Sequence, residues 1–318
     1  MAKVLASGKT PAGTHRPILV DEILRILSPE PGEIAVDCTL GFGGHAQALL
    51  SRLLPGGRLI GIDADPIELA KTETRLRNLG FGPGVFSAHR SNFAGLPQIL
   101  ALAGVTGADL LLADLGVSSM QLDDPARGFS VKHDGPLDMR MNPTRGPSAS
   151  ALLQKFSAEK LAALLHENAD EPRAVEIARA LAGKTFSTTA QLTRAVRDLF
   201  PNLNLDDRDL TVRRVFQALR ISVNDEFSAL DTFLRQLPDC LKSNGRAAIL
   251  TFHSGEDRRV KKAFASGLAS GLYTAISQEI VRPSAEECRA NPRASSAKLR
   301  WARRGPVDHF DGPAMSPS

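Results

Sequence analysis

Apolar residues in the first third of the chain fall into short runs that alternate with amphipathic segments. Four runs bounded by Gly or polar residues predict β-strands at 33–39, 57–63, 84–89 and 108–114. Segments with apolar positions at helical spacing lie between them, at 45–54, 66–79 and 96–103. This alternation predicts a parallel sheet with helices on both faces, and ligands bind beyond the carboxyl ends of such strands.

The alternation is interrupted in the middle of the chain. Amphipathic segments rich in Ala, Leu and Arg follow, and they predict helices at 148–169, 171–183, 188–200 and 211–224. The mixed pattern then resumes with a helix at 226–242, an Asn-Gly turn, a strand at 246–252, a helix at 256–268 and strands at 273–281 and 296–304. We therefore predict an α/β fold whose mostly parallel sheet is split by an inserted all-helical domain.

The predicted domain limits follow from these patterns. Residues 1–120 and 225–304 form the two parts of the α/β domain, residues 121–224 form the helical insert, and residues 305–318 form a flexible tail. The insert leaves the sheet after the fourth strand and returns before the fifth, so we expect it to overhang the ligand cleft and bind the substrate. Arg213, Arg214 and Arg220 are predicted to lie near one face of it, where they would contact phosphates.

Composition narrows the class of protein. The 318 residues are 42% hydrophobic and 23% charged, which is ordinary for a folded globular chain. No apolar run is long enough to span a bilayer and the first residues lack a signal-peptide core, which predicts a cytoplasmic protein without a membrane partner. The cysteines are far apart and form no C-x-x-C pair, so neither disulfides nor a metal site are predicted. The oligomeric state stays open, a homodimer included.

The net charge of +4 is unevenly distributed, with basic clusters at 258–262 and 282–304. Such clusters favour binding to phosphate backbones, although a solvated charged surface explains them equally well. Charge alone therefore leaves both interpretations open.

The stretch "DCTLGFGGHA", which begins at Asp37, is the first candidate for a ligand-binding loop. Gly41, Gly43 and Ala46 have the G-x-G-x-x-A spacing between a predicted strand and a predicted helix. Asp63, at the end of the next strand, would accept hydrogen bonds from the ribose of either NAD or S-adenosylmethionine. Asp37 favours an ammonium group over a pyrophosphate. A tight turn without any ligand is the simplest alternative.

Blocks along most of the chain resemble the signature blocks of the RsmH (MraW) family. They include "DCTLGFGGHA", "DLGVSSMQLDDPARGFS", "VFQALRISVNDEF", "TFHSGEDRRVK" and "NPRASSAKLRWARR". The resemblance implies a Rossmann-like class I methyltransferase fold and S-adenosylmethionine as cofactor. It implies methyl transfer to the N4 amine of a cytidine in the decoding region of 16S ribosomal RNA, with the small ribosomal subunit as partner. The cofactor contacts that it implies are Gly43, Gly44, His45, Asp63, Phe93, Asp114 and Gln121.

The chain also departs from the family pattern. Gly255 stands where the family usually has Leu, Ser295 stands where Arg is common, and the stretch before Arg213 lacks the usual His-Pro. These positions belong to the substrate side, so they put details of RNA contact in doubt and not the fold.

Several of these residues can be given physical roles. Gly43 and Gly44 would let the backbone approach a ligand without a Cβ clash, and free amides at the start of the helix would bind a carboxylate. His45 either faces water or contacts the cofactor. Phe93 either covers an adenine or belongs to the core.

Polar residues that follow the fourth and fifth strands are the candidates for contact with the target amine. Asp114, Ser118, Ser119, His253 and Ser254 lie there, and we predict Ser118 and His253 as catalytic residues. An acceptor for the N–H groups of the amine would favour a pyramidal nitrogen and in-line attack, whereas capping of a loop is the simpler role for the serines. A nicotinamide-dependent oxidoreductase and a non-catalytic RNA-binding assembly factor remain the alternative functions.

Overall fold

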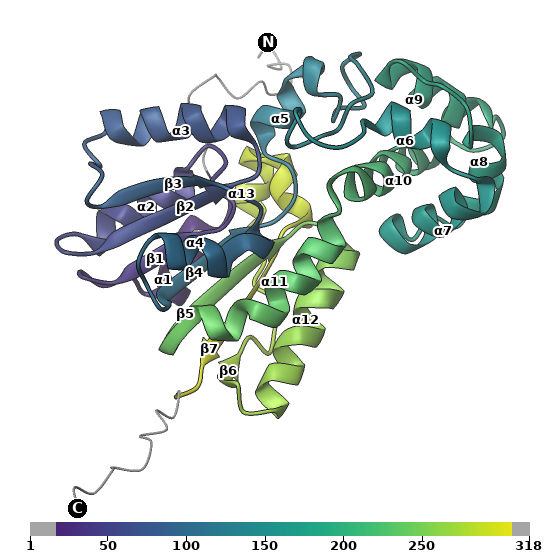
Figure 1. The fold of residues 1–318 in the computed structure, drawn as a ribbon. Helices are drawn as coiled ribbons and strands as arrows, with labels where there is room; N and C mark the ends of the chain where they lie inside the picture. Colours follow the sequence, from purple (N-terminus) through teal and green to yellow (C-terminus); the bar gives the residue numbers. More distant parts are fainter. Residues whose placement is uncertain (1–16, 307–318) are drawn as a thin grey trace, which may run out of the picture.

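The protein, described here as a computed structural model for residues 17–306, is built around a seven-stranded sheet (Figure 1). Its strands are β1 (Ile34–Asp37), β2 (Arg58–Asp63), β3 (Phe86–Arg90), β4 (Ala108–Asp114), β5 (Leu241–Thr251), β6 (Tyr273–Ile276) and β7 (Lys298–Arg304). The order is β3-β2-β1-β4-β5-β7-β6. β1 to β5 pair in parallel, and β7 runs antiparallel to both of its neighbours. The predicted α/β fold class with a mostly parallel sheet is confirmed.

Helices cover both faces of this sheet because its central strands are apolar on both sides. Leu110 and Leu112 of β4 pack in one hydrophobic cluster, while Leu111 and Ala113 pack in the other. The first cluster is covered by α1 (Val20–Leu27), α2 (Gly44–Leu53) and α3 (Pro66–Asn78), and the second by α4 (Leu96–Leu102), α11 (Glu226–Cys240) and α12 (Ser254–Ala269). The carboxyl ends of the parallel strands therefore remain open to a ligand.

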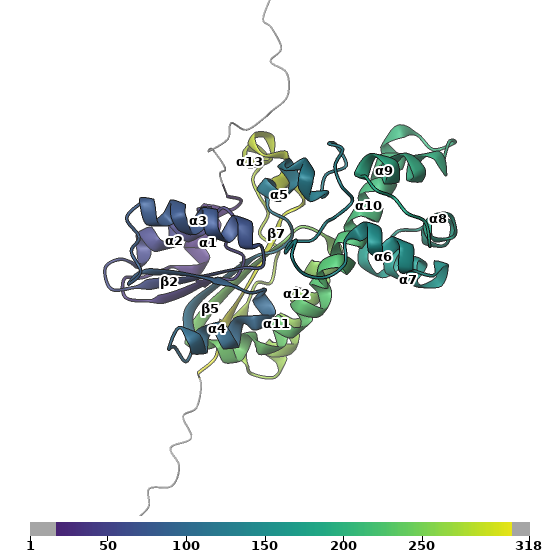
Figure 2. The same cartoon turned by 45° about the horizontal axis from the view of Figure 1, so that its top comes forward.

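A group of helices between β4 and β5 has a hydrophobic cluster of its own, which extends from Phe129 to Leu219. These elements are α5 (Ser119–Asp123), α6 (Ala149–Lys155), α7 (Ala158–Ala169), α8 (Ala174–Leu181), α9 (Thr189–Asp198) and α10 (Leu205–Asn224). Figures 1 and 2 show α6 to α10 beside the sheet and not on it. The domain limits at 120 and 224 stay a prediction, and the tail beyond residue 306 lies outside the described residues.

Several predicted elements differ from the structure. The helix predicted at 211–224 begins earlier, as α10 at Leu205. β5 begins at Leu241, because the predicted Asn-Gly turn lies inside the strand as an irregularity: its pairing with β4 jumps from Leu241 to Arg246, and Asn244 has a φ of 64°. The predicted strand 273–281 ends at Ile276, and beyond it Val281 makes only an isolated bridge. The predicted helix 148–169 is divided into α6 and α7, since Ser157 caps a new helix.

No helix within residues 17–306 is long and apolar enough to cross a membrane. Nor do three His, Cys, Asp or Glu side chains in this range gather closely enough to hold a metal ion. Between β6 and β7 the chain forms α13 (Ala285–Ala290) and the short 3₁₀ helix η3 (Pro292–Ser296).

Candidate functional site

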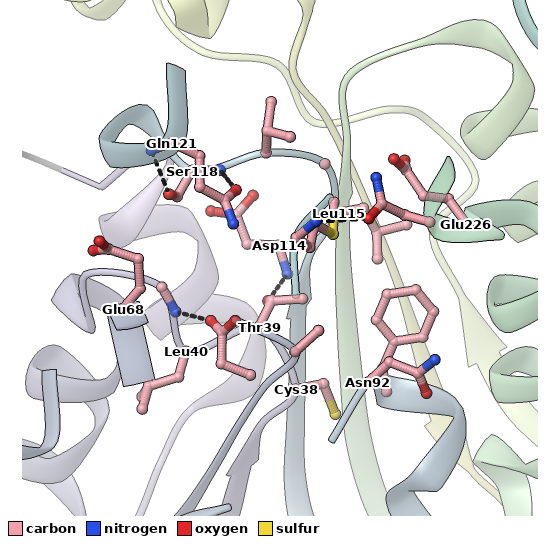
Figure 3. Close-up of a pocket in the computed structure, with 18 of the residues that line it drawn as sticks. Cys38, Thr39, Leu40, Glu68, Asn92, Asp114, Leu115, Ser118, Gln121 and Glu226 are labelled. Atoms are coloured by element: carbon pink, nitrogen blue, oxygen red, sulfur yellow. Dashed lines mark hydrogen bonds between the residues drawn. The ribbon is translucent and has the colours of Figure 1, made fainter. Parts of the chain in front are cut away.

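A cavity of about 1240 Å³ lies at the carboxyl ends of β1, β2 and β4. One part, which we call the loop side, is lined by residues from 38–45, 63–68 and 90–93. The other part, the insert side, is lined by residues from 141–146, 213–230 and 252–256. In Figure 3, Leu40 and Glu68 lie on one side of the cavity, Glu226 lies on the other, and Asp114 lies between them. Single-ligand pockets occupy roughly 300–1,000 Å³, so this cavity has room for more than one ligand.

The glycine loop between β1 and α2 is shaped by contacts within the protein. Gly43 has a φ of 74°, and a Cβ atom there would lie 2.6 Å from Cγ2 of Thr72 on α3. A Cβ atom on Gly44 would lie 2.8 Å from the ring of Pro17. We predicted that these glycines leave room for a ligand, but at both positions the missing Cβ leaves room for the protein's own side chains. The backbone of both residues nevertheless lines the cavity.

Asp63 fastens this loop to the end of β2. Its Oδ2 accepts the Gly41 amide at 2.7 Å, and its Oδ1 accepts the Asp65 amide at 2.8 Å. Burial raises the pKa of Asp63 to about 6, against these two hydrogen bonds, which lower it. Each carboxylate oxygen retains a lone pair for a second donor, so Asp63 is still able to accept from a ligand hydroxyl.

Asp37 is a second buried carboxyl group, next in the chain to Cys38 on the loop side, although it does not itself line the cavity. Its side chain is 1% exposed, and burial raises its pKa to about 7. His45 acts in the opposite direction, while Asp63 and Asp114 raise this pKa further. Several acidic groups therefore surround the loop side, an arrangement that disfavours an anionic ligand and favours a cationic one.

His45 and Asp114 point toward one another across the cavity wall. His45, in the first turn of α2, is only 7% exposed, and its Nε2 lies 3.6 Å from Oδ2 of Asp114. Within residues 17–306, Nε2 of His45 and Oδ1 of Asp114 are both buried without a hydrogen-bond partner. The alternative in which His45 faces water is therefore wrong. Buried polar atoms without partners are rare in proteins and indicate a missing ligand or water.

Ser118 and Gln121 line the cavity and form the capping box of α5 (Figure 3). Oγ of Ser118 accepts the Gln121 amide at 3.2 Å, and Oε1 of Gln121 accepts the Ser118 amide at 3.0 Å. Nε2 of Gln121 donates to Asp65 at 2.9 Å. Ser118 therefore has the predicted capping role, and its hydroxyl hydrogen is still able to donate a hydrogen bond.

His253 does not line the cavity. It caps α12, where its Nδ1 accepts the Glu256 amide at 3.4 Å and its Nε2 lies 3.1 Å from Oε1 of Glu256. The neighbouring Ser254 donates to Asp170 at 2.9 Å. The structure therefore does not bring His253 together with Ser118, and Phe252 and Glu256 reach the cavity in its place.

Phe93 combines both of its expected roles. It lines the cavity after β3, and its ring packs edge-on against Phe233 with centroids 5.4 Å apart. One part of the ring therefore belongs to the core, while another part remains available to a ligand.

Sequence reasoning missed the ion pair between Asp65 and Arg127. Asp65 is fully buried and accepts Nη1 of Arg127 at 2.7 Å, and Nη2 of Arg127 donates to the carbonyls of Arg140 and Met141. This pair joins the turn after β2 to the segment that leads into the insert. The Asp-Pro at a helix start was a visible capping signal, but nothing in the spacing identified a partner so far along the chain.

The three arginines expected on one face of the insert have different environments. Arg213 is exposed, lines the cavity and has no ion pair within the described residues. Arg214 lies 3.8 Å from Glu171. Arg220 donates to both oxygens of Glu226 at 2.9 Å. Arg213 and Arg220 both line the cavity, as a shared face requires, whereas Arg214 does not. Of these three, Arg213 is the one without an ion pair within the described residues, so it is the one free to meet a phosphate. Arg145, exposed and also without an ion pair in residues 17–306, lines the same cavity.

Comparison with known protein families identifies the family to which this chain belongs. The model of the MraW methylase family matches residues 12–305. The chain belongs to the MraW methylase family. Ribosomal RNA small subunit methyltransferase H 2 of Alkaliphilus metalliredigens is 49% identical over 95% of this chain and 88% of its own. Ribosomal RNA small subunit methyltransferase H 1 of Lachnoclostridium phytofermentans is 47% identical over 94% of this chain and 84% of its own. Ribosomal RNA small subunit methyltransferase H of Halorhodospira halophila is 42% identical over 94% of this chain and 97% of its own.

Membership confirms the resemblance seen in the sequence, and it identifies the protein as a methylase with S-adenosylmethionine as cofactor. The chemistry of the residues around the loop side of this methylase fits S-adenosylmethionine. Free amides at the start of α2 match its carboxylate, and the acidic residues match its positive charges.

Asp63→Ala in this methylase is expected to weaken cofactor binding by about 1.5–3 kcal/mol, because the sequence predicts that Asp63 is a charged acceptor for the ribose hydroxyls. Calorimetry with S-adenosylhomocysteine measures the change. Thermal unfolding recorded in parallel shows whether the fold survives. Unchanged affinity would exclude Asp63 from the cofactor site.

Proposed function

We propose that this methylase transfers the methyl group of S-adenosylmethionine to the N4 amine of a cytidine in the decoding region of 16S ribosomal RNA. The observation that carries the proposal is the single cavity with two different sides. The loop side is lined by the acidic residues Asp63 and Glu68, whereas Arg145 and Arg213 line the insert side without ion pairs in the described part of the chain. A cationic cofactor suits the first side, and a nucleotide with its phosphates suits the second.

The loop side would hold the cofactor through groups that the structure places there. Amides of Gly44 and His45 would bind its carboxylate, Asp37 would compensate its ammonium group, Asp63 would accept from its ribose, and Phe93 would cover its adenine. When bound, the cofactor supplies a methyl group on a positively charged sulfur.

Asp114 is the best-placed acceptor for the target amine. It ends β4 at the boundary between the two sides, its amide is held by Thr39 Oγ1 at 2.6 Å, and its Oδ1 is buried without a partner. The lone pair of a cytosine amine is delocalised into the ring. An acceptor for its N–H bonds, such as Asp114 with Ser118 beside it, would favour the pyramidal nitrogen needed for in-line attack. The amine loses its proton after methylation, so no strong base is required.

The relatives support ribosomal RNA as the substrate, since those at 42–49% identity are named ribosomal RNA small subunit methyltransferases. The cytidine N4 position and the decoding region come from the family resemblance of the sequence. His253 has no direct part in this proposal, because it does not line the cavity.

Nucleoside analysis tests the proposal. The protein is incubated with labelled S-adenosylmethionine and either naked 16S RNA or small subunits, and the digested RNA is analysed by mass spectrometry. We expect N4-methylcytidine at one site in the decoding region. Methylation of another atom or another region would overturn the finer assignment, and absence of transfer to either substrate would favour an RNA-binding assembly factor. Tight NADH binding without binding of S-adenosylhomocysteine would favour an oxidoreductase.

Replacing Arg145 and Arg213 with Ala is expected to weaken RNA binding and to leave cofactor affinity unchanged. Loss of two phosphate contacts should reduce the log-log salt slope of RNA binding by roughly 1.4–1.8. RNA binding measured at several salt concentrations gives this slope. Arg194→Ala is the control, because Arg194 is also exposed and unpaired within residues 17–306 but does not line the cavity. An unchanged slope in the double variant would move the RNA-binding surface to another basic segment.

A further inference from the structure

Gly255, the second residue of α12, leaves a space that another side chain fills. A Cβ atom at this position would lie 2.6 Å from Cζ of Phe227 and 3.3 Å from Nδ1 of His253. The backbone of Gly255 is not in the left-handed region, so its conformation is open to any residue. The ring of Phe227, and not the backbone, therefore requires glycine at this position.

Contacts on several sides hold the ring of Phe227 in this space. The guanidinium carbon of Arg259 lies 3.7 Å from the ring centroid, and Nη1 of Arg259 donates to the carbonyl of Gly255 at 3.2 Å. The ring of His253 lies 5.6 Å away. Because Phe227 is only 8% exposed and is held by these contacts, a new side chain at 255 would have to displace its ring.

The remaining surface of Phe227 borders the insert side of the cavity. Val223, Leu230 and Phe252 are further apolar residues that line the same cavity. A base that is unstacked for chemistry needs apolar or aromatic surface to replace its stacking partners. Phe227 is a large aromatic group at the boundary of the space that the proposed function assigns to the target nucleotide.

We propose that Gly255 and Phe227 form a coupled pair that sets the shape of the insert side and thereby positions the target base. Gly255 provides the space for the ring, and Phe227 is the residue against which the base packs. This inference rests on the proposed function, because it takes the insert side as the place of the RNA base. It also gives a structural meaning to the departure at 255, where the family usually has Leu: a leucine at that position and the ring of Phe227 would occupy the same volume.

A double-mutant cycle tests the coupling. The variants are Gly255→Leu, Phe227→Leu and the combination of both, with Gly255→Ala as a milder form if Gly255→Leu does not fold. We expect Gly255→Leu to lower kcat/KM for RNA on the order of 10-fold or more, since packing of a base against an aromatic group is worth roughly 5- to 100-fold. The combined variant should be no less active than Phe227→Leu alone, because the smaller side chain introduced by Phe227→Leu leaves room for the one introduced by Gly255→Leu, whereas the aromatic surface for the base is absent from both. Affinity for S-adenosylhomocysteine should change by less than about twofold, since the pair lies outside the loop side.

Gly267→Ala is the matched control on the same helix. A Cβ atom there would overlap the ring of Tyr273, so it introduces a similar clash away from the cavity. It should lower the melting temperature without raising the KM for RNA. The inference is overturned if the two Leu substitutions are additive in kcat/KM, or if cofactor affinity falls together with activity. An inactive wild-type enzyme would instead overturn the proposed function, and the cycle in melting temperature would still report whether the two side chains are coupled.

Discussion

Arg127→Ala is expected to lower the free energy of unfolding by about 3 kcal/mol, because it leaves the buried Asp65 carboxylate without its cationic partner. Breaking a buried pair costs roughly 3–5 kcal/mol. The lower end applies here, since Asp65 retains hydrogen bonds from Nε2 of Gln121 and from the amide of Ile67. The carbonyls of Arg140 and Met141 also lose their donor. Denaturant-induced unfolding of the wild type and the variant measures the difference.

The pair between Arg197 and Asp209 provides a control with an equally short ion-pair distance in a different environment. Its nitrogen-to-oxygen distance is 2.7 Å, as in the pair between Arg127 and Asp65, but both of its side chains are more than 40% exposed. Arg197→Ala should therefore cost less than about 1 kcal/mol. Equal losses in the two variants would show that burial does not determine the strength of the Arg127 pair.

The α/β core was predictable because its signals are local. β4, with apolar residues on both faces, could belong only to a sheet covered on both sides, and the structure places Leu111 and Leu112 in opposite clusters. The Asn-Gly signal marked a real distortion at Asn244, yet tertiary pairing of Leu241 with Ala108 extended the strand across it. Local turn chemistry therefore located the irregularity but not the beginning of the strand.

The site was predictable at the positions where the end of a strand determines the location of a side chain. Asp63 and Asp114 end β2 and β4, and both line the cavity as a parallel sheet requires. His253 also follows a strand, but the capping geometry of α12 turns its ring toward Glu256. Arg220 was predicted to contact RNA. Its ion-pair partner Glu226 was missed, because it lies across a helix junction, which no spacing rule covers. Pairwise contacts of this kind depend on the tertiary structure.

Cofactor binding is expected to weaken about 100-fold between pH 8 and pH 5, because the buried carboxyl group of Asp37 must be ionised to compensate the ammonium group of S-adenosylmethionine. Burial raises the pKa of Asp37 to about 7 in the ligand-free protein, and Asp63, with a pKa of about 6, acts in the same direction. Below these values a proton must leave before the cation binds, which costs about tenfold per pH unit for one group. Calorimetry with S-adenosylhomocysteine over this pH range measures the effect.

The stability of the ligand-free protein should change in the opposite direction. Asp37 binds its proton more tightly in the folded state than in the unfolded state, so its contribution to stability is lost as the pH rises from about 4 to about 7. Asp37→Asn should remove most of both dependences, whereas Asp206→Asn at an exposed position should change neither. If Asp37→Asn bound the cofactor as tightly as the wild type and kept the same pH profile, the ammonium group would be compensated elsewhere. Asp114, whose buried Oδ1 has no partner within residues 17–306, would then be the carboxylate to replace next.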